Sequence, residues 1–547
     1  MNNSTCSKLL PLHTSLSTRT FFLIVLVLLL CVPCQTKEYT RTHYFKEQLI
    51  YHESNFDPTT DIASDPHLRG IFHTKTWRQR YYLCDKYFKR PGPIFLIMGG
   101  EEEITPQDGI LYPFVSEHLA PHFSAMVIQP EHRFYGDSQP LGSQSKVTNE
   151  DLIKLMNPEQ AMWDAVKLVD FIKSRYGCAS SSKSEHHCPV IAVGGSYPGF
   201  LAAMMRFLHS DKIDAAYAAS APIQFYAQKV EQWAYYDHIT TVADKSSPGC
   251  SDSIKTALMN ILDVIAKEVV SMEEAAQKMG ICFIPEYMKK DKTTFVNEIM
   301  MIVGYTFANY NMAYYPPTNA TSLYQACQIF QDGSLSFFDQ IYSFFQPYYI
   351  TQTSTAENLC FDITNQMPSG PYATISSGDW SGVGSQWSGN MWDFQTCSFL
   401  IEKIGFSKQS MFPPRTWTLE WLTDHCQNRF QATPKPDYYV DKWGFDSDSF
   451  VSNGASRILF TNGLNDGWSV SGIQSNLSET VLALNFENGA HHSDLSRNGP
   501  SQNDTMDIQQ GFVAIQNILS TFLKDVKSEY FPIEIFEVHE EEDLSIF

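Results

Sequence analysis

The chain has 547 residues, of which 43% are hydrophobic, and its formal net charge at pH 7 is −21. This length and apolar content suffice for a large core and for more than one structural unit. The excess of acidic side chains argues against nucleic acid and against anionic membrane surfaces as partners.

The first 35 residues have the pattern of a secretory signal peptide. Lys8 and Arg19 precede the apolar run FFLIVLVLLLCVP at 21–33, and residues 34–36 offer a cleavage region. The run is too short for a comfortable membrane span, and an uncleaved signal anchor is the alternative. We therefore expect entry into the secretory pathway, a lysosomal or extracellular destination, and no stable membrane association after cleavage.

Cysteines and glycosylation motifs agree with that compartment. Beyond residue 35 the cysteines form no C-x-x-C pair, which argues against a zinc site. In a secreted chain they predict disulfides, with one cysteine left over. Beyond residue 35 lie three N-x-S/T motifs, at Asn319, Asn476 and Asn503, which predict a glycoprotein.

Residues 36–220 alternate strand and helix patterns in the way that is typical of a parallel α/β sheet. Apolar runs at 93–98, 125–129 and 213–222 predict buried strands, and the first of them ends at Gly99-Gly100. A helix is expected at 157–176, where Asn157 can cap it and Gln160 has capping-box spacing. We interpret this block as the first part of the core.

The segment PVIAVGGSYPGF at 189–200 has the order strand, glycine turn, serine, helix. A nucleophile elbow requires this context, because the turn lifts the serine hydroxyl to the N-terminus of a helix. The spacing departs from G-x-S-x-G, since Pro198 stands where the second glycine is expected and Gly199 follows it. Proline suits the first helical turn. The alternative is an ordinary glycine-serine turn with no catalytic role.

The rest of the chain predicts an insertion followed by a return to the core. Residues 221–380 have helical periodicity and few strand runs, so we expect an inserted helical domain. A loop is expected at 376–390, and residues 381–527 form the second part of the core, with the α/β pattern resuming near 391. The remaining expectations are strands at 456–460 and 480–486, a helix at 507–526, and a solvated acidic tail at 528–547.

An acid and a base follow the serine in the order of an α/β-hydrolase. Asp466 comes after the strand at 456–460, and His491 and His492 come after the strand at 480–486. Histidine would take the serine proton, and the aspartate would orient it. The backbone N–H groups of Tyr197 and Gly100 are the expected oxyanion donors. A turn-forming Asn-Asp-Gly, a surface histidine pair and a plain glycine turn are the alternatives.

An ordered set of motifs resembles the serine peptidase family of lysosomal Pro-X carboxypeptidase, dipeptidyl peptidase II and thymus-specific serine protease. The motifs are WRQRY at 77–81, EHRFYG at 131–136, EQA at 159–161, GGSY at 194–197, ASAP at 219–222, MFPP at 411–414, NGLNDGW at 462–468 and GAHHSDL at 489–495. The resemblance implies that Ser196, Asp466 and His491 are nucleophile, acid and base. His492 is held in reserve as the base.

The resemblance also implies an α/β-hydrolase core with a helical domain over the site, and Trp468 in an apolar pocket for proline. Two motifs depart from the family pattern: Asp466-Gly467-Trp468 has glycine in place of proline, and the N-terminal Gln-x-x-Asp-His-Phe is degraded at 48–53. Cys84 is the odd cysteine. The implied disulfides are Cys178–Cys188, Cys250–Cys327, Cys282–Cys360 and Cys397–Cys426.

We therefore expect a serine exopeptidase that needs no metal or organic cofactor and cleaves short peptides after proline, in the manner of a Pro-X carboxypeptidase. A dipeptidyl peptidase acting after proline or alanine from the N-terminus is the alternative within the family. Glu101, Glu102 and Glu103 are candidates for binding its amine. An esterase and a non-catalytic binding protein on the same fold are the alternatives outside it. A homodimer is left open.

Overall fold

The computed structural model describes residues 42–49, 52, 75–105, 109–142, 147–179, 184–284, 289, 291–347, 360–362 and 386–530. The expected signal peptide and most of the expected acidic tail lie outside these ranges. The expected loop at 376–390 falls partly outside them. Within these ranges, no helix is long and apolar enough to cross a bilayer.

An eight-stranded sheet forms the centre of the core, in the order β1-β2-β4-β3-β5-β6-β9-β10. β2 pairs antiparallel with both β1 and β4, and all the other neighbours are parallel. This topology confirms the expected α/β-hydrolase core. The strands are β1 His43–Leu49, β2 Thr76–Cys84, β3 Ile94–Ile97, β4 Met126–Pro130, β5 Val190–Gly195, β6 Ala215–Ala219, β9 Ile458–Gly463 and β10 Val481–Phe486.

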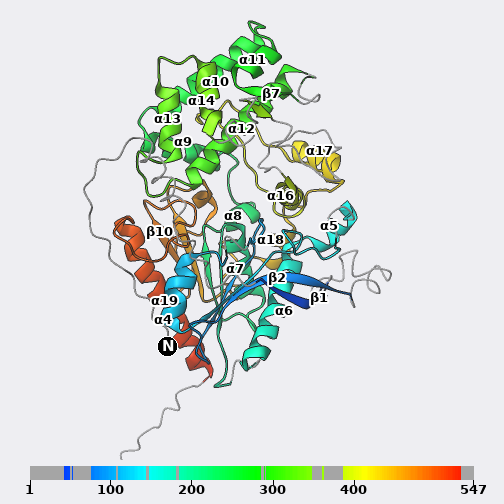
Figure 1. Ribbon diagram of the computed structural model, residues 1–547, viewed down its shortest axis with the longest axis vertical. Coiled ribbons are helices and arrows are strands. Elements are labelled where there is room, and N and C mark those ends of the chain that lie inside the picture. The colour runs from blue at the N-terminus through cyan, green and yellow to red at the C-terminus, as the bar shows by residue number, and fades with distance from the viewer. Residues whose placement is uncertain are drawn as a thin grey trace, which may run out of the picture.

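Helices cover both faces of this sheet, because its parallel strands are apolar on both sides. Along β3, Ile94 and Leu96 belong to one core cluster, and Phe95 and Ile97 belong to the other. The first face is packed by α6 (Pro158–Tyr176) and α7 (Tyr197–Leu208), and the second by a π-helix at Phe114–Leu119, α4 (Ala120–Phe123) and α19 (Met506–Tyr530). Figure 1 shows α19 and α4 on one side of the sheet and α6 on the other.

The start of α6 follows the predicted cap only in part. The side chain of Asn157 accepts a hydrogen bond from the N–H of Gln160, and Gly177 ends the helix with a φ of 69°. The side chain of Gln160 does not return to the cap, however. It donates to the carbonyl of His52 and accepts from the N–H of His52, both at 2.8 Å. The reciprocal half of the capping box is therefore replaced by a contact that joins α6 to the end of β1.

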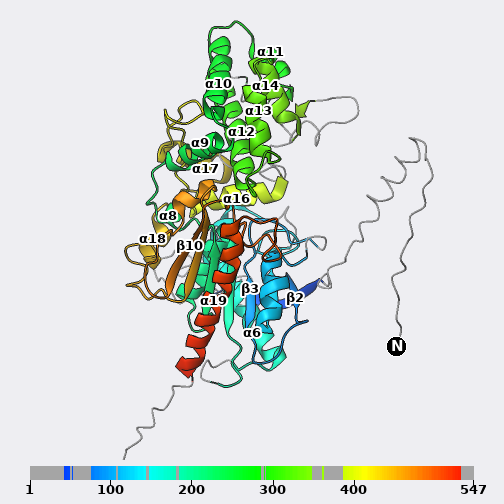
Figure 2. The ribbon, with the colours of Figure 1, turned by 90° about the vertical axis from the view of Figure 1, so that its left-hand side faces the viewer.

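The region between β6 and residue 347 is mostly helical and lies beyond one end of the sheet (Figures 1 and 2). Its apolar side chains continue the larger core cluster, so it packs on the core rather than standing apart. Its elements are α8 Ile223–Tyr226, α9 Ala234–Ser246, α10 Cys250–Ala266, α11 Met272–Lys278, β7 Ile281–Phe283, α12 Lys292–Met312, α13 Ser322–Gln331 and α14 Phe337–Phe345. Further along the chain, β8 (Phe361–Asp362) pairs in parallel with β7.

Three more helices, α16, α17 and α18, precede the return to the sheet, and α5 (Asn149–Leu155) comes from the first half of the chain. α16 spans Gln386–Ser398, α17 spans Leu419–Phe430 and α18 spans Tyr438–Trp443. The last five residues of the expected loop at 376–390 are therefore the first residues of α16. The sheet itself resumes at β9, later than the expected residue 391, because this stretch packs against α5 and β2 as helices.

Candidate active site

Ser196 stands in a sharp turn between β5 and α7. Its φ of 63° and ψ of −133° lie in a region that serine adopts only under strain. The N–H of Ser196 donates to the carbonyl of Ala219 on β6 at 2.9 Å, which fixes the turn to the sheet. A Cβ at Gly194 would lie 2.0 Å from the carbonyl oxygen of Pro198, so only glycine fits there. The structure therefore has the strand-turn-helix geometry expected of a nucleophile elbow.

Asp466 and His491 are brought together at the ends of neighbouring strands. The Oδ2 atom of Asp466 lies 2.6 Å from Nδ1 of His491. The Asp466 side chain is fully buried, whereas the His491 side chain is 9% exposed. Asp466 also accepts from the N–H of Trp468 at 3.1 Å, which fixes the carboxylate in place. This contact leaves Nε2 of His491 available for a proton from a serine.

His492 occupies a different position from its neighbour. Its ring lies against Gly195, where a Cβ would come within 2.8 Å of it, and its N–H donates to the hydroxyl of Ser220 at 2.9 Å. Burial, together with the adjacent His491, lowers the pKa of His492 to about 3. His492 is therefore neutral at physiological pH, and the first histidine of the pair is the one that contacts Asp466.

The two expected oxyanion donors lie close to each other. Tyr197 is the first residue of α7, so its N–H has no acceptor within the helix. Gly100 follows β3, and a Cβ there would lie 2.6 Å from Cγ of Pro198. The loop after β3 therefore approaches the first turn of α7 closely, and Gly100 and Ser196 line the same cavity. This arrangement fits a site for developing negative charge.

That cavity has a volume of about 1030 Å³ and lies between the carboxyl ends of the strands and the helical region. Ser196, His491 and Trp468 line it from the core, and Tyr235 and Tyr305 line it from α9 and α12. The volume is at the upper end of the range of about 300–1,000 Å³ that is typical of ligand pockets. It is large enough for a short peptide.

Trp468 forms one apolar wall of this cavity. Its ring centroid lies 4.9 Å from that of Tyr235, 5.8 Å from that of Phe225 and 6.3 Å from that of His491. Its indole N–H points to the sulfur of Met312 at 3.3 Å. The half-buried ring is therefore fixed close to the catalytic candidates, with an apolar surface exposed to a ligand.

Two carboxyl groups in the cavity have strongly raised pKa values. Burial, with a smaller contribution from the neighbouring Glu102, raises the pKa of Glu101 to about 7. Burial raises the pKa of Glu402 to about 8, although the Tyr226 hydroxyl donates to it at 3.3 Å. Both carboxyl groups are therefore largely protonated in an acidic compartment.

Comparison with known proteins agrees with this geometry. The profile of the family described as serine carboxypeptidase S28 matches residues 71–513. The chain belongs to this family. It is 28% identical to lysosomal Pro-X carboxypeptidase of Mus musculus over 78% of this chain and 81% of that protein. It is 27% identical to the same enzyme of Homo sapiens, over 78% and 80%, and 26% identical to thymus-specific serine protease of Mus musculus, over 83% and 85%.

As an S28 peptidase, the protein is a serine-type hydrolase with peptide substrates. The cysteines in the described part of the chain form four disulfides, and Cys84, which is buried, takes no part in them. These disulfides are Cys178–Cys188, Cys250–Cys327, Cys282–Cys360 and Cys397–Cys426. The three side chains Asn319, Asn476 and Asn503 are exposed and accessible to glycosylation.

One cluster among the described residues has the side chains of a metal site, namely Cys397, His425 and Cys426. Its two sulfurs are joined in a disulfide, so they are not thiolates that could bind zinc. His425 instead contacts the carboxylate of Asp393 at 3.1 Å. The cluster is therefore a structural connection between α16 and α17.

The sequence did not point to Tyr112. Its hydroxyl accepts a hydrogen bond from the N–H of Gly195 at 3.1 Å, directly before Ser196. Its ring contacts the edge of His492, with centroids 5.9 Å apart, and its backbone has a φ of 59°. Tyr112 lies before the π-helix in a stretch without any recognisable motif, so no local pattern could have indicated this contact.

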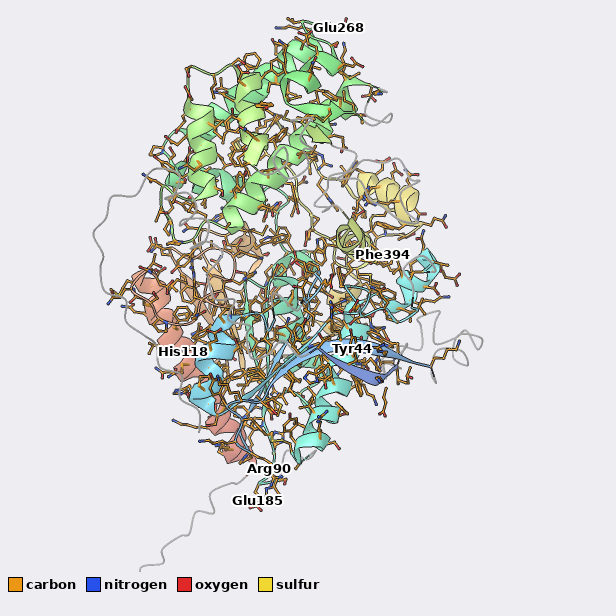
Figure 3. The ribbon with its side chains drawn as sticks, in the orientation of Figure 1. Tyr44, Arg90, His118, Glu185, Glu268 and Phe394 are labelled. Carbon is orange, nitrogen blue, oxygen red and sulfur yellow. A yellow bond between two sulfur atoms is a disulfide. The ribbon has the colours of Figure 1, made fainter. Side chains whose placement is uncertain are left out.

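Gln395 of α16 was also missed. Its amide donates to the hydroxyl of Tyr197 at 3.0 Å and accepts from the hydroxyl of Tyr135 at 2.7 Å. The Tyr197 hydroxyl also contacts Nε2 of His132 at 3.1 Å. This buried network joins α16 to the residue that follows Ser196. Phe394, the neighbour of Gln395, lies between the core and the helical region in Figure 3.

Proposed function

We propose that this S28 peptidase is an exopeptidase that removes the C-terminal residue from short peptides by cleaving after proline. The observation that carries the proposal is that Ser196, His491 and Trp468 line one cavity beneath the helical region. A cover over the carboxyl end of the sheet favours chain ends over folded proteins. Relatives named lysosomal Pro-X carboxypeptidase support the choice of proline.

The proposed reaction proceeds through an acyl-enzyme. The Ser196 hydroxyl oxygen attacks the carbonyl carbon of the proline residue, and Nε2 of His491 accepts the hydroxyl proton. Asp466 stabilises the imidazolium that forms. The N–H groups of Tyr197 and Gly100 donate to the oxyanion of the tetrahedral intermediate. As the C–N bond breaks, His491 returns the proton to the leaving amine, and the C-terminal residue departs.

Hydrolysis of the acyl-enzyme completes the cycle. His491 takes a proton from water, the hydroxide attacks the ester carbonyl, and the protonated His491 gives its proton back to Ser196. The products are the shortened peptide, which now ends in proline, and the free amino acid. The peptide and one water molecule are the reactants, and His491 returns each proton that it accepts.

Trp468 is proposed to bind the proline ring. Its half-buried indole, together with Tyr235 and Pro222, gives the cavity an apolar wall next to His491. A proline ring is compact and apolar and buries its surface well against aromatic faces. Alanine would fill less of the same space, so we expect weaker cleavage after alanine.

Covalent labelling by a fluorophosphonate tests the nucleophile. We expect labelling of the wild-type protein and none of Ser196→Ala, with both proteins equally folded by circular dichroism. Labelling of Ser196→Ala at the wild-type rate would contradict the role of Ser196. The same experiment separates an active peptidase from a binding protein built on this fold, and an ester screen would reveal an esterase.

A dipeptidyl peptidase is the second candidate, because Glu101 and Glu402 also line the cavity and a carboxylate could bind a substrate amine. Benzyloxycarbonyl-Pro-Phe, which has a blocked N-terminus, and fluorogenic Lys-Pro and Lys-Ala dipeptides, which have a free amine, distinguish the two modes. Cleavage of the blocked substrate alone supports the carboxypeptidase. Cleavage of the free-amine substrates alone would replace it with the dipeptidyl mode.

The proposed location is the secretory pathway, with a lysosomal or extracellular destination. The signal pattern at 1–35, the exposed sites Asn319, Asn476 and Asn503, and relatives named as lysosomal support it. The raised pKa values of Glu101 and Glu402 are consistent with an acidic environment.

A further inference from the structure

The charge of the cavity is unevenly distributed. Among the described residues that line it, Arg415 is the only arginine or lysine, whereas Glu101, Glu102, Glu103 and Glu402 supply carboxyl groups. A substrate group with negative charge would therefore find one cationic partner in this space. Arg415 lies in the segment between α16 and α17, away from the strands that hold Ser196 and His491.

The backbone of Arg415 is firmly held. Its N–H donates to the carbonyl of Phe406 at 3.0 Å, and its carbonyl accepts from the N–H of Phe406 at 2.8 Å. Two residues later, the N–H of Trp417 donates to the side chain of Gln232 at 2.8 Å. The side chain of Arg415 is therefore presented from a fixed point on the wall of the cavity.

The guanidinium of Arg415 stacks on an aromatic face but lacks an acidic partner. Its central carbon lies 4.4 Å from the ring centroid of Trp421. No carboxylate in the described part of the chain lies within ion-pair distance of it. The side chain is half-buried, so water screens its charge only in part. Stacking restricts the guanidinium to one plane and leaves its N–H groups free to bind a carboxylate in bidentate fashion.

We propose that Arg415 binds the free C-terminal carboxylate of the peptide substrate, with the C-terminal side chain packed against Trp417 and Trp421. Both tryptophans line the same cavity as Ser196. This assignment rests on the proposed carboxypeptidase function and makes Arg415 the residue that distinguishes a chain end from an internal peptide bond. The preferred leaving residue is apolar or aromatic, because tryptophan faces supply its binding surface.

The acidic side chains of the cavity compete only weakly with the substrate carboxylate for the guanidinium of Arg415. Glu103 is bound to Arg80 at 2.8 Å. The raised pKa values of Glu101 and Glu402 keep both carboxyl groups largely protonated in an acidic compartment. Arg415 then remains a fixed cation while two of the neighbouring acids lose their charge.

The test compares benzyloxycarbonyl-Pro-Phe with its C-terminal amide, which lacks the negative charge. For the wild type we expect kcat/KM to be about 10- to 100-fold higher for the substrate with a free carboxylate than for its amide. This is the expected effect of losing one charge-assisted pair of hydrogen bonds. Arg415→Gln should lose this preference mainly through a higher KM for the acid. Arg415→Lys keeps the charge without the planar fork and should retain part of the preference.

The matched control is Arg78→Gln. Arg78 also stacks on an aromatic ring, at 4.1 Å from the ring centroid of Tyr44, but it is exposed on β2, next to the edge strand β1. Figure 3 shows Tyr44 on β1, away from the helical region. The control should keep the wild-type ratio of acid to amide. Fluorophosphonate labelling at the wild-type rate shows that each variant is folded with a working nucleophile.

The outcomes separate the two proposals. A wild type that cleaves the acid no better than the amide overturns the role of Arg415 without any variant, and so does an Arg415→Gln variant with an unchanged ratio. In both cases the carboxypeptidase function stands. A wild type that reacts with the fluorophosphonate but cleaves neither blocked substrate removes the carboxypeptidase function, and this inference with it.

Discussion

The hydroxyl of Tyr112 lies 3.1 Å from the backbone nitrogen of Gly195 and accepts its hydrogen bond. This contact ties a loop from the other face of the sheet to the residue before Ser196. Tyr112 has a φ of 59°, an unfavourable backbone conformation for a tyrosine. The surrounding contacts therefore hold Tyr112 in place, and the strained turn at Ser196 is supported from outside β5.

Tyr112→Phe keeps the ring against His492 and removes the acceptor for the Gly195 N–H. We expect the free energy of unfolding to fall by about 1–3 kcal/mol, because a buried donor loses its partner. We also expect a lower kcat, since the turn that presents Ser196 can relax. Urea unfolding and hydrolysis of benzyloxycarbonyl-Pro-Phe measure the two effects. Tyr87, which is half-buried and does not line the cavity, supplies the control Tyr87→Phe. Equal kinetics for both variants would contradict support of the turn by Tyr112.

Asp466→Asn tests the orientation of His491. The asparagine amide group can donate to Nδ1 of His491, where the carboxylate could only accept. The imidazole proton then lies on Nε2, which can no longer accept the proton of Ser196. We expect kcat to fall by about 10⁴-fold with little change in KM, as in other serine hydrolases with this arrangement. The exposed Asp332, in the helical region, supplies the control Asp332→Asn. A loss of less than about 10-fold would mean that another residue orients His491.

The sequence predicted the turn at Ser196 and the start of α6 because the residues that specify them are close together in the chain. The glycine pair before Ser196, the proline after it and the cap at Asn157 each act over a few residues. The order of Asp466 and His491 after their strands was equally readable, since the carboxyl ends of parallel strands meet at one edge. The structure has Asp466 in contact with His491 rather than with His492.

Contacts between distant segments did not follow from the sequence. Gln395 lies 198 residues from Tyr197, and nothing in the pattern of α16 indicates that its amide would bind that hydroxyl. Gln160 had the spacing of a capping box, but burial beside His52 offered its side chain two backbone partners instead. Periodicity reports which face of an element is apolar, and it does not report which element packs there.

Glu402 should make stability depend on pH between its unfolded pKa of 4.5 and its folded pKa of about 8. Its pKa in the folded protein is about 8, against an ordinary value of 4.5, so the folded state retains a proton that the unfolded state has released. Stability therefore falls as the pH rises from 6.5 to 8. This window lies above the region where the low pKa values of His132 and His492 act in the opposite direction.

Replacement of Glu402 by glutamine should reduce this dependence, because the variant has no proton to lose. The melting temperature measured by differential scanning calorimetry at pH 6.5 and at pH 8 should differ less for Glu402→Gln than for the wild type. Glu185→Gln is the control, since Glu185 is exposed at the far end of the core (Figure 3). If the difference between the two melting temperatures were the same in Glu402→Gln as in the wild type, other groups would cause the pH dependence.

Trp468→Ala should weaken the preference for proline. The variant opens the apolar wall next to His491, so a proline ring loses its contact surface while alanine loses little. We expect the ratio of kcat/KM for benzyloxycarbonyl-Pro-Phe over benzyloxycarbonyl-Ala-Phe to fall by about 10-fold. Trp163→Ala, outside the cavity, is the control. Equal ratios in Trp468→Ala and the wild type would place the proline pocket elsewhere.

The order of the strands has a consequence for biosynthesis. Ser196 follows β5, but Asp466 and His491 follow β9 and β10, and the whole helical region lies between them in the chain. During translation Ser196 therefore emerges from the ribosome long before Asp466 and His491 are synthesised. If these residues act as proposed, catalysis begins only after β9 has paired with β6 and β10 has paired with β9. The order of synthesis would then delay proteolysis until both strands are in place.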